Sequence, residues 1–146
     1  AACISNPSSL TIAANGHNPA DYCILVVEDN ELNLKVLELM LAKLGYRTKT
    51  ATDGLNALEL LKTDAIDLVL MDCSMPVLDG YLTTSKIRKP ETGTRKPDIP
   101  IIAITARAMD GDKEKCIQTG MNDYLAKPIK CTELADKARL WLNRAS

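Results

Sequence analysis

The chain has 146 residues, 46% of them hydrophobic, and a formal net charge of −1. This length suits one domain with a sizeable core, and the composition excludes a wholly disordered chain. The near-neutral charge gives no argument for a nucleic-acid or anionic-membrane surface, and no apolar run approaches the roughly 20 residues that span a bilayer.

Residues 1–21 are rich in Ser, Asn, Pro, Ala and Gly and have no sustained periodicity. This composition predicts a linker or flexible N-terminal segment before a domain that covers residues 22–144. A domain preceded in this way is expected to have been cut from a longer protein.

From Tyr22 onward, short apolar runs alternate with segments that have helical spacing. Strands are expected at 23–27, 46–51, 68–71, 99–104 and 123–126. Helices are expected at 34–44, 53–61, 81–88, 110–119 and 132–142. The second strand is the more polar one and is expected at a sheet edge, and residues 89–98 are expected to form a charged loop. This alternation predicts an α/β fold, a doubly wound five-stranded parallel sheet with five helices in the flavodoxin-like order.

Five cysteines are present, an odd number, and no two form a Cys-x-x-Cys pair. Cys23 and Cys73 lie in or beside apolar runs, where a reduced and buried thiol is the ordinary state. The N-terminus lacks the basic start and apolar stretch of a signal peptide. We therefore expect a cytoplasmic domain, whether or not a longer parent protein is anchored in a membrane.

The segment 67–80, DLVLMDCSMPVLDG, carries the strongest functional signal. Four apolar residues run into Asp72, and Met75-Pro76 and Asp79-Gly80 then force the chain to turn. Parallel sheets bind ligands at the carboxyl ends of their strands. Asp72 is therefore a candidate nucleophile or metal ligand, and the alternative is a strand-end carboxylate satisfied by loop amides.

Strands that neighbour this one in the expected sheet also end in reactive side chains. These side chains are Glu28, Asp29, Thr105 and Lys127. Three carboxylates in one partly desolvated site repel each other strongly, and a divalent cation relieves that repulsion. Oxygen ligands without a His or Cys set favour Mg²⁺ over Zn²⁺. With a lysine ammonium and a threonine hydroxyl added, the set describes a phosphoryl-transfer site whose product is an aspartyl phosphate on Asp72.

In this order and spacing, the residues resemble the receiver domain of two-component response regulators. The matching residues are Glu28-Asp29, Met71-Asp72, Met75-Pro76, Asp79-Gly80, Thr105-Ala106 and Lys127-Pro128. The resemblance covers about residues 22–143. Glu28-Asp29-Asn30 with Asn33, and the stretch 105–129, are most similar to receivers attached to hybrid sensor histidine kinases. A single-domain response regulator is the alternative parent.

The resemblance implies that Asp72 accepts a phosphoryl group from a phosphohistidine, and that Thr105 and Lys127 bind the phosphoryl oxygens. The implied Mg²⁺ ligands are Glu28, Asp29, Asp72 and the backbone carbonyl of Ser74. The implied partner is a histidine phosphotransfer protein or a histidine kinase domain, with no nucleic acid and no membrane contact by this domain. The domain would then catalyse its own phosphotransfer and dephosphorylation.

The resemblance also implies a conformational switch. Tyr124 matches the aromatic switch position, whose ring turns inward as Thr105 moves toward the phosphate. Ser74 and Arg107 match two variable positions that tend to set how fast the aspartyl phosphate hydrolyses. Output is expected through the fourth strand, the flanking helix and the fifth strand. The acidic pair is Glu-Asp where Asp-Asp is the usual form, a difference that receivers commonly accept.

Each of these residues also has an ordinary structural interpretation. Lys127 could be a solvated loop lysine, Thr105 a helix cap, and Tyr124 a packing residue. A phosphatase of the haloacid dehalogenase type also uses Asp, Thr, Lys and Mg²⁺, but it needs a second Asp where this chain has Ser74. A degenerate receiver that only binds partners would lack part of the set. His17, the single histidine, lies in a turn-like sequence, so we expect the phosphoryl donor to be another domain, another protein or a small molecule.

Overall fold

A computed structural model describes residues 18–73, 80–105 and 110–145. The strands are β1 (Cys23–Val27), β2 (Arg47–Ala51), β3 (Leu68–Asp72), β4 (Ile101–Thr105) and β5 (Asp123–Ala126). The α-helices are α2 (Glu31–Leu44), α3 (Gly54–Thr63), α4 (Gly80–Arg88), α5 (Asp110–Thr119) and α6 (Cys131–Ala145). Two short 3₁₀ turns, η2 (Pro19–Asp21) and η3 (Pro90–Thr92), complete the described elements.

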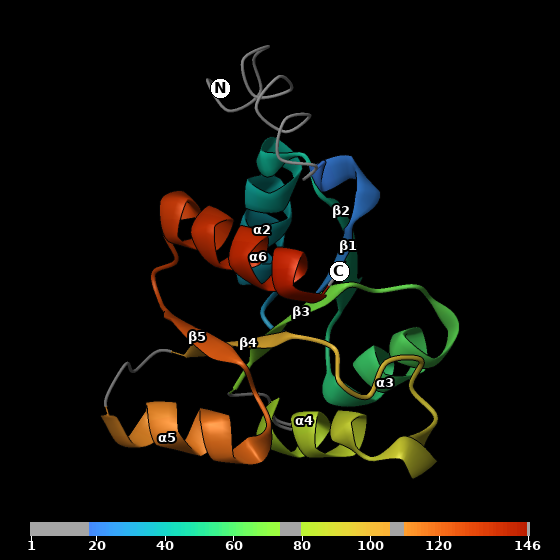
Figure 1. Cartoon of the computed structure of the whole chain (residues 1–146). Coiled ribbons are helices and arrows are strands. Elements are labelled where there is room, and N and C mark those ends of the chain that lie inside the picture. Colours follow the sequence, from blue (N-terminus) through green and yellow to red (C-terminus); the bar gives the residue numbers. More distant parts are fainter. Residues whose placement is uncertain (1–17, 74–79, 106–109, 146) are drawn as a thin grey trace.

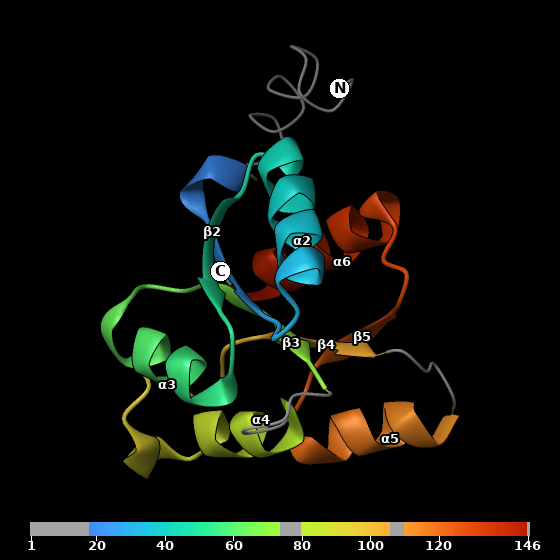
Figure 2. The ribbon, with the colours of Figure 1, turned by 180° about the vertical axis from the view of Figure 1, so that it is seen from behind.

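The five strands form one parallel sheet in the order β2-β1-β3-β4-β5. Helices α2 and α6 lie on one face of this sheet, and α3, α4 and α5 lie on the other (Figures 1 and 2). The predicted doubly wound α/β fold is confirmed, with β2 at an edge. β1, β3, β4 and β5 are neighbours in this order. Their carboxyl ends, which carry the reactive side chains, therefore lie side by side.

Both faces of the central strands are buried, so their sequences read as continuous apolar runs. Every residue of β1, β3 and β4 is buried. Alternate side chains enter two separate clusters: Val26 packs in the cluster with Leu37 of α2, and Val27 packs in the cluster with Ala57 of α3. The two clusters fix which side chains at the strand ends face α2 and which face α3, α4 and α5.

Helix α2 begins directly after the acidic pair because Asn30 caps it. The Asn30 Oδ1 atom accepts hydrogen bonds from the backbone N–H groups of Leu32 (2.9 Å) and Asn33 (3.1 Å). At the other end, Gly45 has a φ of 95°, the left-handed conformation that ends helices. Both ends are therefore set by local chemistry, and the cap holds the chain close to the end of β1.

Element boundaries differ from the sequence prediction by a few residues. Strand β4 starts at Ile101 because Pro100 has no N–H to donate, although its carbonyl accepts a hydrogen bond from Val69 at 3.0 Å. Helix α6 extends beyond the predicted 132–142 at both ends. The end of the predicted linker forms η2, held by Arg47 Nε donating to the Ala20 carbonyl at 3.0 Å.

Several predicted features lie outside the described residues: Ser74, the turn through Met75-Pro76 and Asp79, Arg107 and His17. Among the described residues, no helix has the length and apolar character needed to cross a membrane.

Gly80 lets helix α4 start in direct contact with the end of β3. A Cβ atom at this position would overlap the backbone oxygen of Asp72 and lie 2.9 Å from the Cα atom of Cys73. Both of these neighbours are backbone atoms, which cannot move aside without shifting the strand end. Only glycine therefore permits this approach of α4 to the residue that carries the central carboxylate.

We expect Gly80→Ala to destabilise the protein by about 1–3 kcal/mol, the usual range for forcing extra volume into a packed interior. Equilibrium urea unfolding, followed by circular dichroism, measures this difference. Leu82→Ala on the same helix is the control, because the Leu82 side chain is 54% exposed and surface substitutions usually change stability by less than about 0.5 kcal/mol. Equal unfolding midpoints for the two variants would contradict the close-packing argument.

Candidate phosphoryl-acceptor site

Alternation along the strands brings the charged side chains to one face. Leu125, Val26 and Leu70 all belong to the cluster beneath α2 and α6. Because side chains two residues apart in a strand point the same way, the residues two positions further on share that face. Those residues are Lys127, Glu28 and Asp72. The strand period thus converts three separate sequence positions into one cluster.

The three predicted carboxylates do come together. Glu28, Asp29 and Asp72 each offer one oxygen, and these oxygens all lie within 4.8 Å of one another. Glu28 is fully buried, Asp72 is 3% exposed, and Asp29 is exposed. The cluster therefore has two carboxylates inside the protein and one on the solvent side, where water can complete a coordination shell.

Lys127 supplies the positive charge of the cluster. Its Nζ atom lies 3.2 Å from Glu28 Oε1 and 3.8 Å from Asp72 Oδ1. The Lys127 backbone N–H donates to the Thr105 carbonyl at 2.8 Å, and this bond holds the end of β5 beside the end of β4. The Lys127–Pro128 peptide bond is cis. The simple reading of Lys127 as a solvated loop lysine is excluded, because its ammonium contacts two buried carboxylates.

Opposing effects act on the Glu28 carboxyl. Burial raises its pKa, whereas the neighbouring Asp72 side chain and the Lys127 ammonium lower it, and the net effect is a pKa below the ordinary value of 4.5. Glu28 is thus ionised at neutral pH in spite of its complete burial. The cluster sets three carboxyl side chains against one ammonium, and a further cation would relieve the repulsion among the carboxylates.

The unmatched oxygen of Glu28 is the structural feature that tests the fit of a metal ion. Glu28 Oε2 is buried and has no hydrogen-bond partner among the described residues. A buried charged oxygen without a donor is unfavourable by several kcal/mol in general, so such an atom calls for a bound cation or its water. Because the neighbouring ligands are all oxygens with solvent on one side, the residues present fit a hard divalent cation that retains water.

The side chains of Thr105 and Tyr124 lie on the face of the sheet opposite to the one that α6 covers. Thr105 is the last residue of β4 and is 8% exposed. Tyr124 pairs in register with Ala103, and Thr105 pairs with Ala126, so the Thr105 and Tyr124 side chains share one face of adjacent strands. The Tyr124 ring is partly buried against the cluster that contains Ile87. The fold therefore places the two predicted switch residues next to each other along the edge.

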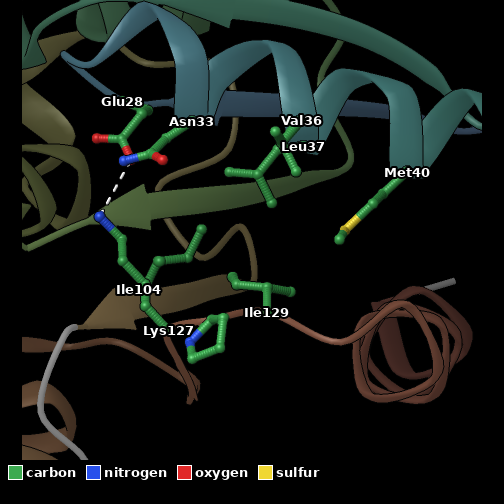
Figure 3. A pocket seen from close by; sticks show the side chains of 9 residues that line it. Glu28, Asn33, Val36, Leu37, Met40, Ile104, Lys127 and Ile129 are labelled. Carbon is green, nitrogen blue, oxygen red and sulfur yellow. Dashed lines mark hydrogen bonds and ion pairs between the residues drawn. The ribbon is translucent and has the colours of Figure 1, made fainter.

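Beside the site is a cavity that the sequence prediction did not include. Its volume is about 420 Å³, and its lining residues are Glu28, Asn33, Val36, Leu37, Met40, Ile104, Lys127, Pro128 and Ile129. In Figure 3 the apolar side chains of α2 face Ile129 across the cavity, and the Glu28–Lys127 ion pair lies at one end. The 33, 36, 37, 40 spacing in α2 is one helical stripe, a signal that could have indicated this wall.

A second contact set that the sequence prediction missed joins β5 to α6. The Asp123 carboxylate accepts hydrogen bonds from Lys137 Nζ at 2.7 Å, Trp141 Nε1 at 3.0 Å and the Tyr124 backbone N–H at 2.8 Å. Burial raises the pKa of Asp123, but these donors outweigh it and the net shift is downward. No local pattern predicts this set, because its members come from two elements.

Comparison with known proteins identifies the family. Residues 24–139 match the model of the response regulator receiver domain. The chain is 42% identical over 137 residues to the hybrid signal transduction protein dokA of Dictyostelium discoideum, covering 93% of this chain and 8% of that protein. It is 39% identical over 124 residues to the sensor histidine kinase RcsC of Escherichia coli, covering 85% of this chain and 12% of that protein. The chain thus spans a small part of these curated relatives.

Solved structures agree with the sequence relatives. The receiver domain of the sensor histidine kinase PA1611 from Pseudomonas aeruginosa, with a magnesium ion in its active site cleft, is 48% identical at a TM-score of 0.75, covering 84% of this chain and 98% of that one. The receiver domain of Ssk1 from Saccharomyces cerevisiae, solved with the histidine phosphotransfer protein Ypd1, is 32% identical at a TM-score of 0.77, covering 86% and 92%. From the family match, the relatives and the fold together, the chain belongs to the response regulator receiver family.

Proposed function

We propose that Asp72 is the phosphoryl acceptor of this receiver domain and takes the group from a phosphohistidine. The observation that carries the proposal is the position of the Asp72 carboxylate. It is almost fully buried, it belongs to an acidic cluster that fits a divalent cation, and its Oδ1 atom lies 3.8 Å from the Lys127 ammonium. An acceptor carboxylate needs opposite charge close by, because the incoming phosphoryl group is itself an anion.

In the proposed step, an Asp72 oxygen attacks phosphorus as the phosphorus–nitrogen bond to the donor imidazole breaks. The donor ring carries a proton on its other nitrogen, so when the electron pair of that bond returns to the ring, the imidazole leaves as neutral histidine. The product is an aspartyl phosphate. Lys127 neutralises charge on the phosphoryl oxygens, and the Thr105 hydroxyl donates a hydrogen bond to one of them. The buried Asp72 carboxylate is held in place by β3, so little reorganisation accompanies the attack.

The bound cation that we propose is Mg²⁺, which would neutralise the charge that builds up on the phosphoryl oxygens. Glu28, Asp29 and Asp72 would hold it, together with the Ser74 carbonyl, which lies outside the described residues. The unmatched Glu28 Oε2 supports this assignment, because a cation or its water would satisfy that atom. The other expected roles, Tyr124 as the switch residue and Ser74 and Arg107 as lifetime-setting residues, remain part of the proposal.

We further propose that the receiver unit covers residues 22–144 of a hybrid histidine kinase and works in the cytoplasm. The similarity to receiver segments of dokA and RcsC supports such a parent protein. The partner would be a histidine phosphotransfer protein or the kinase domain itself. The related Ssk1 receiver domain, solved in complex with the histidine phosphotransfer protein Ypd1, supports the first choice.

The surface beside the site suits a partner that must bring a phosphohistidine to Asp72. Helix α2 carries Leu32, which is 73% exposed, and Val36, which is 43% exposed, on its accessible side. Val36 also lines the cavity next to the Glu28–Lys127 ion pair (Figure 3). Exposed apolar side chains grouped beside a reactive site are typical of a protein-binding surface. The phosphodonor is therefore expected to dock on α2.

Incubation with acetyl phosphate and Mg²⁺ should raise the mass of the protein by one phosphoryl group, as measured by intact-mass spectrometry. Asp72→Ala should show no increase, because no other carboxylate in the described ranges has the same neighbours. Asp98→Ala, which removes an exposed carboxylate, should be labelled as well as the wild type. An unchanged wild-type mass, or equal labelling of Asp72→Ala, would refute the proposed acceptor.

Asp29→Asn should weaken Mg²⁺ binding at least tenfold, because the carboxylate that it neutralises would lie within a few ångströms of the doubly charged ion. Isothermal titration calorimetry of the free protein measures this affinity. Glu59→Gln removes the same charge from an exposed position on α3 and should leave the affinity unchanged. Equal Mg²⁺ affinities in Asp29→Asn and Glu59→Gln would refute the proposed metal site at Glu28 and Asp29.

Val36→Glu should slow phosphotransfer from a phosphorylated histidine phosphotransfer protein about 5- to 30-fold, the range for losing one important interface side chain. Labelling by acetyl phosphate should stay at the wild-type rate, because the reacting groups are untouched. Leu55→Glu is the matched control: Leu55 is 55% exposed but lies on α3, across the sheet. The assay measures phosphotransfer rates from a panel of purified histidine phosphotransfer proteins. If the phosphodonor docks elsewhere, Val36→Glu and Leu55→Glu should show equal rates.

A further inference from the structure

One ammonium on helix α6 contacts two neighbouring residues of the edge strand β5. Lys137 Nζ lies 2.7 Å from Asp123 Oδ1 and 5.3 Å from the centroid of the Tyr124 ring. Successive residues of a strand point to opposite faces, so Asp123 faces α6 and Tyr124 faces away from it. Lys137 therefore reaches around the edge of the sheet, from the face that carries α6 to the ring on the other side.

Asp123 holds Lys137 in this position. The Asp123 carboxylate is also bound by the Trp141 indole and by the Tyr124 backbone N–H, so it is fixed from both α6 and β5. The Lys137 and Asp123 side chains are 28% and 19% exposed, which leaves the pair only partly screened by solvent. An ammonium anchored in this way presents its charge to the negative face of the Tyr124 ring.

We propose that Lys137 is a positioning residue that holds the Tyr124 ring where the structure shows it and opposes its turn toward Thr105. This inference rests on the proposed function, in which Tyr124 responds to phosphorylation at Asp72. Two positions of the ring are in equilibrium, and a contact made in only one of them shifts that equilibrium. Lys137 thus sets how readily the Tyr124 ring on β5 changes position when Asp72 is phosphorylated.

The expected size of the effect follows from the type of contact. A cation over an aromatic ring at a partly exposed site changes an equilibrium about two- to fivefold. Lys137→Met keeps an unbranched apolar side chain of similar length but removes the charge, so the second ring position should gain population by that factor. Lys137→Arg keeps a cation and should restore the wild-type balance.

Carbon-13 labelling of the four tyrosines, with Tyr124→Phe used for assignment, lets NMR follow the ring directly. In the free protein, the Tyr124 ring signal of Lys137→Met should move toward its position in wild type bound to Mg²⁺ and beryllofluoride, a phosphoryl mimic. The beryllofluoride concentration for half-saturation should fall about two- to fivefold. Trp141, the single tryptophan, reports by its fluorescence whether the Asp123 contacts survive the substitution.

Lys130→Met is the charge-matched control, because Lys130 is exposed and lies closer in the chain to Lys127. An unchanged ring signal and midpoint in Lys137→Met would overturn the proposal, and so would an equal change in Lys130→Met, which would indicate a long-range charge effect. A failure of Lys137→Arg to restore the wild-type values would also overturn it. If the wild type itself bound no beryllofluoride and accepted no phosphoryl group, the proposed function would fail; a wild type that binds normally isolates the role of Lys137.

Discussion

The contact of one lysine ammonium with two buried carboxylates is the interaction on which this site depends. Lys127 Nζ lies within 3.8 Å of both Glu28 and Asp72, whose side chains are almost without solvent exposure. Burying ionised carboxylates is unfavourable unless they are paired and hydrogen-bonded. Lys127 provides that pairing, but one positive charge does not balance three carboxylates. The remaining negative charge, with the unmatched Glu28 Oε2, makes the edge of the sheet suited to a divalent cation.

The sheet makes this arrangement possible because it is parallel and buried on both faces. Four adjacent strands end at one edge, and the period of two residues sends Glu28, Asp72 and Lys127 to the face beneath α2. Gly80 then lets α4 begin against the backbone of Asp72, so the central carboxylate is fixed from two directions. The packing that stabilises the fold therefore also preorganises the reacting groups. A mutation that disturbs this packing is expected to disturb the site, and a mutation in the site is expected to disturb the packing.

Much of the fold was predictable because local patterns in this chain agree with the global structure. The continuous apolar run 68–71 is typical of a strand buried on both faces, and Asn30 and Gly45 carry the chemistry of a helix start and a helix end. Boundaries were less accurate where neighbours decide them. Strand β4 begins after Pro100, because proline has no N–H group to donate a hydrogen bond to the neighbouring strand. The end of the predicted linker forms η2, where Arg47 donates a hydrogen bond to the Ala20 carbonyl.

By itself, the sequence determined the parallel α/β fold and the set of reactive residues at the strand ends, because strand period, helix caps and residue chemistry are local properties. Only the tertiary structure decided how those residues interact. It decided that Lys127 pairs with Glu28 as well as Asp72, and that α2 forms a cavity wall beside the site. It also decided that one Glu28 oxygen has no hydrogen-bond partner within the described part of the chain. It also decided that Lys137 reaches around β5 to Tyr124. These contacts join residues from different elements, so their distances depend on how the helices pack on the sheet, which no local pattern in the sequence encodes.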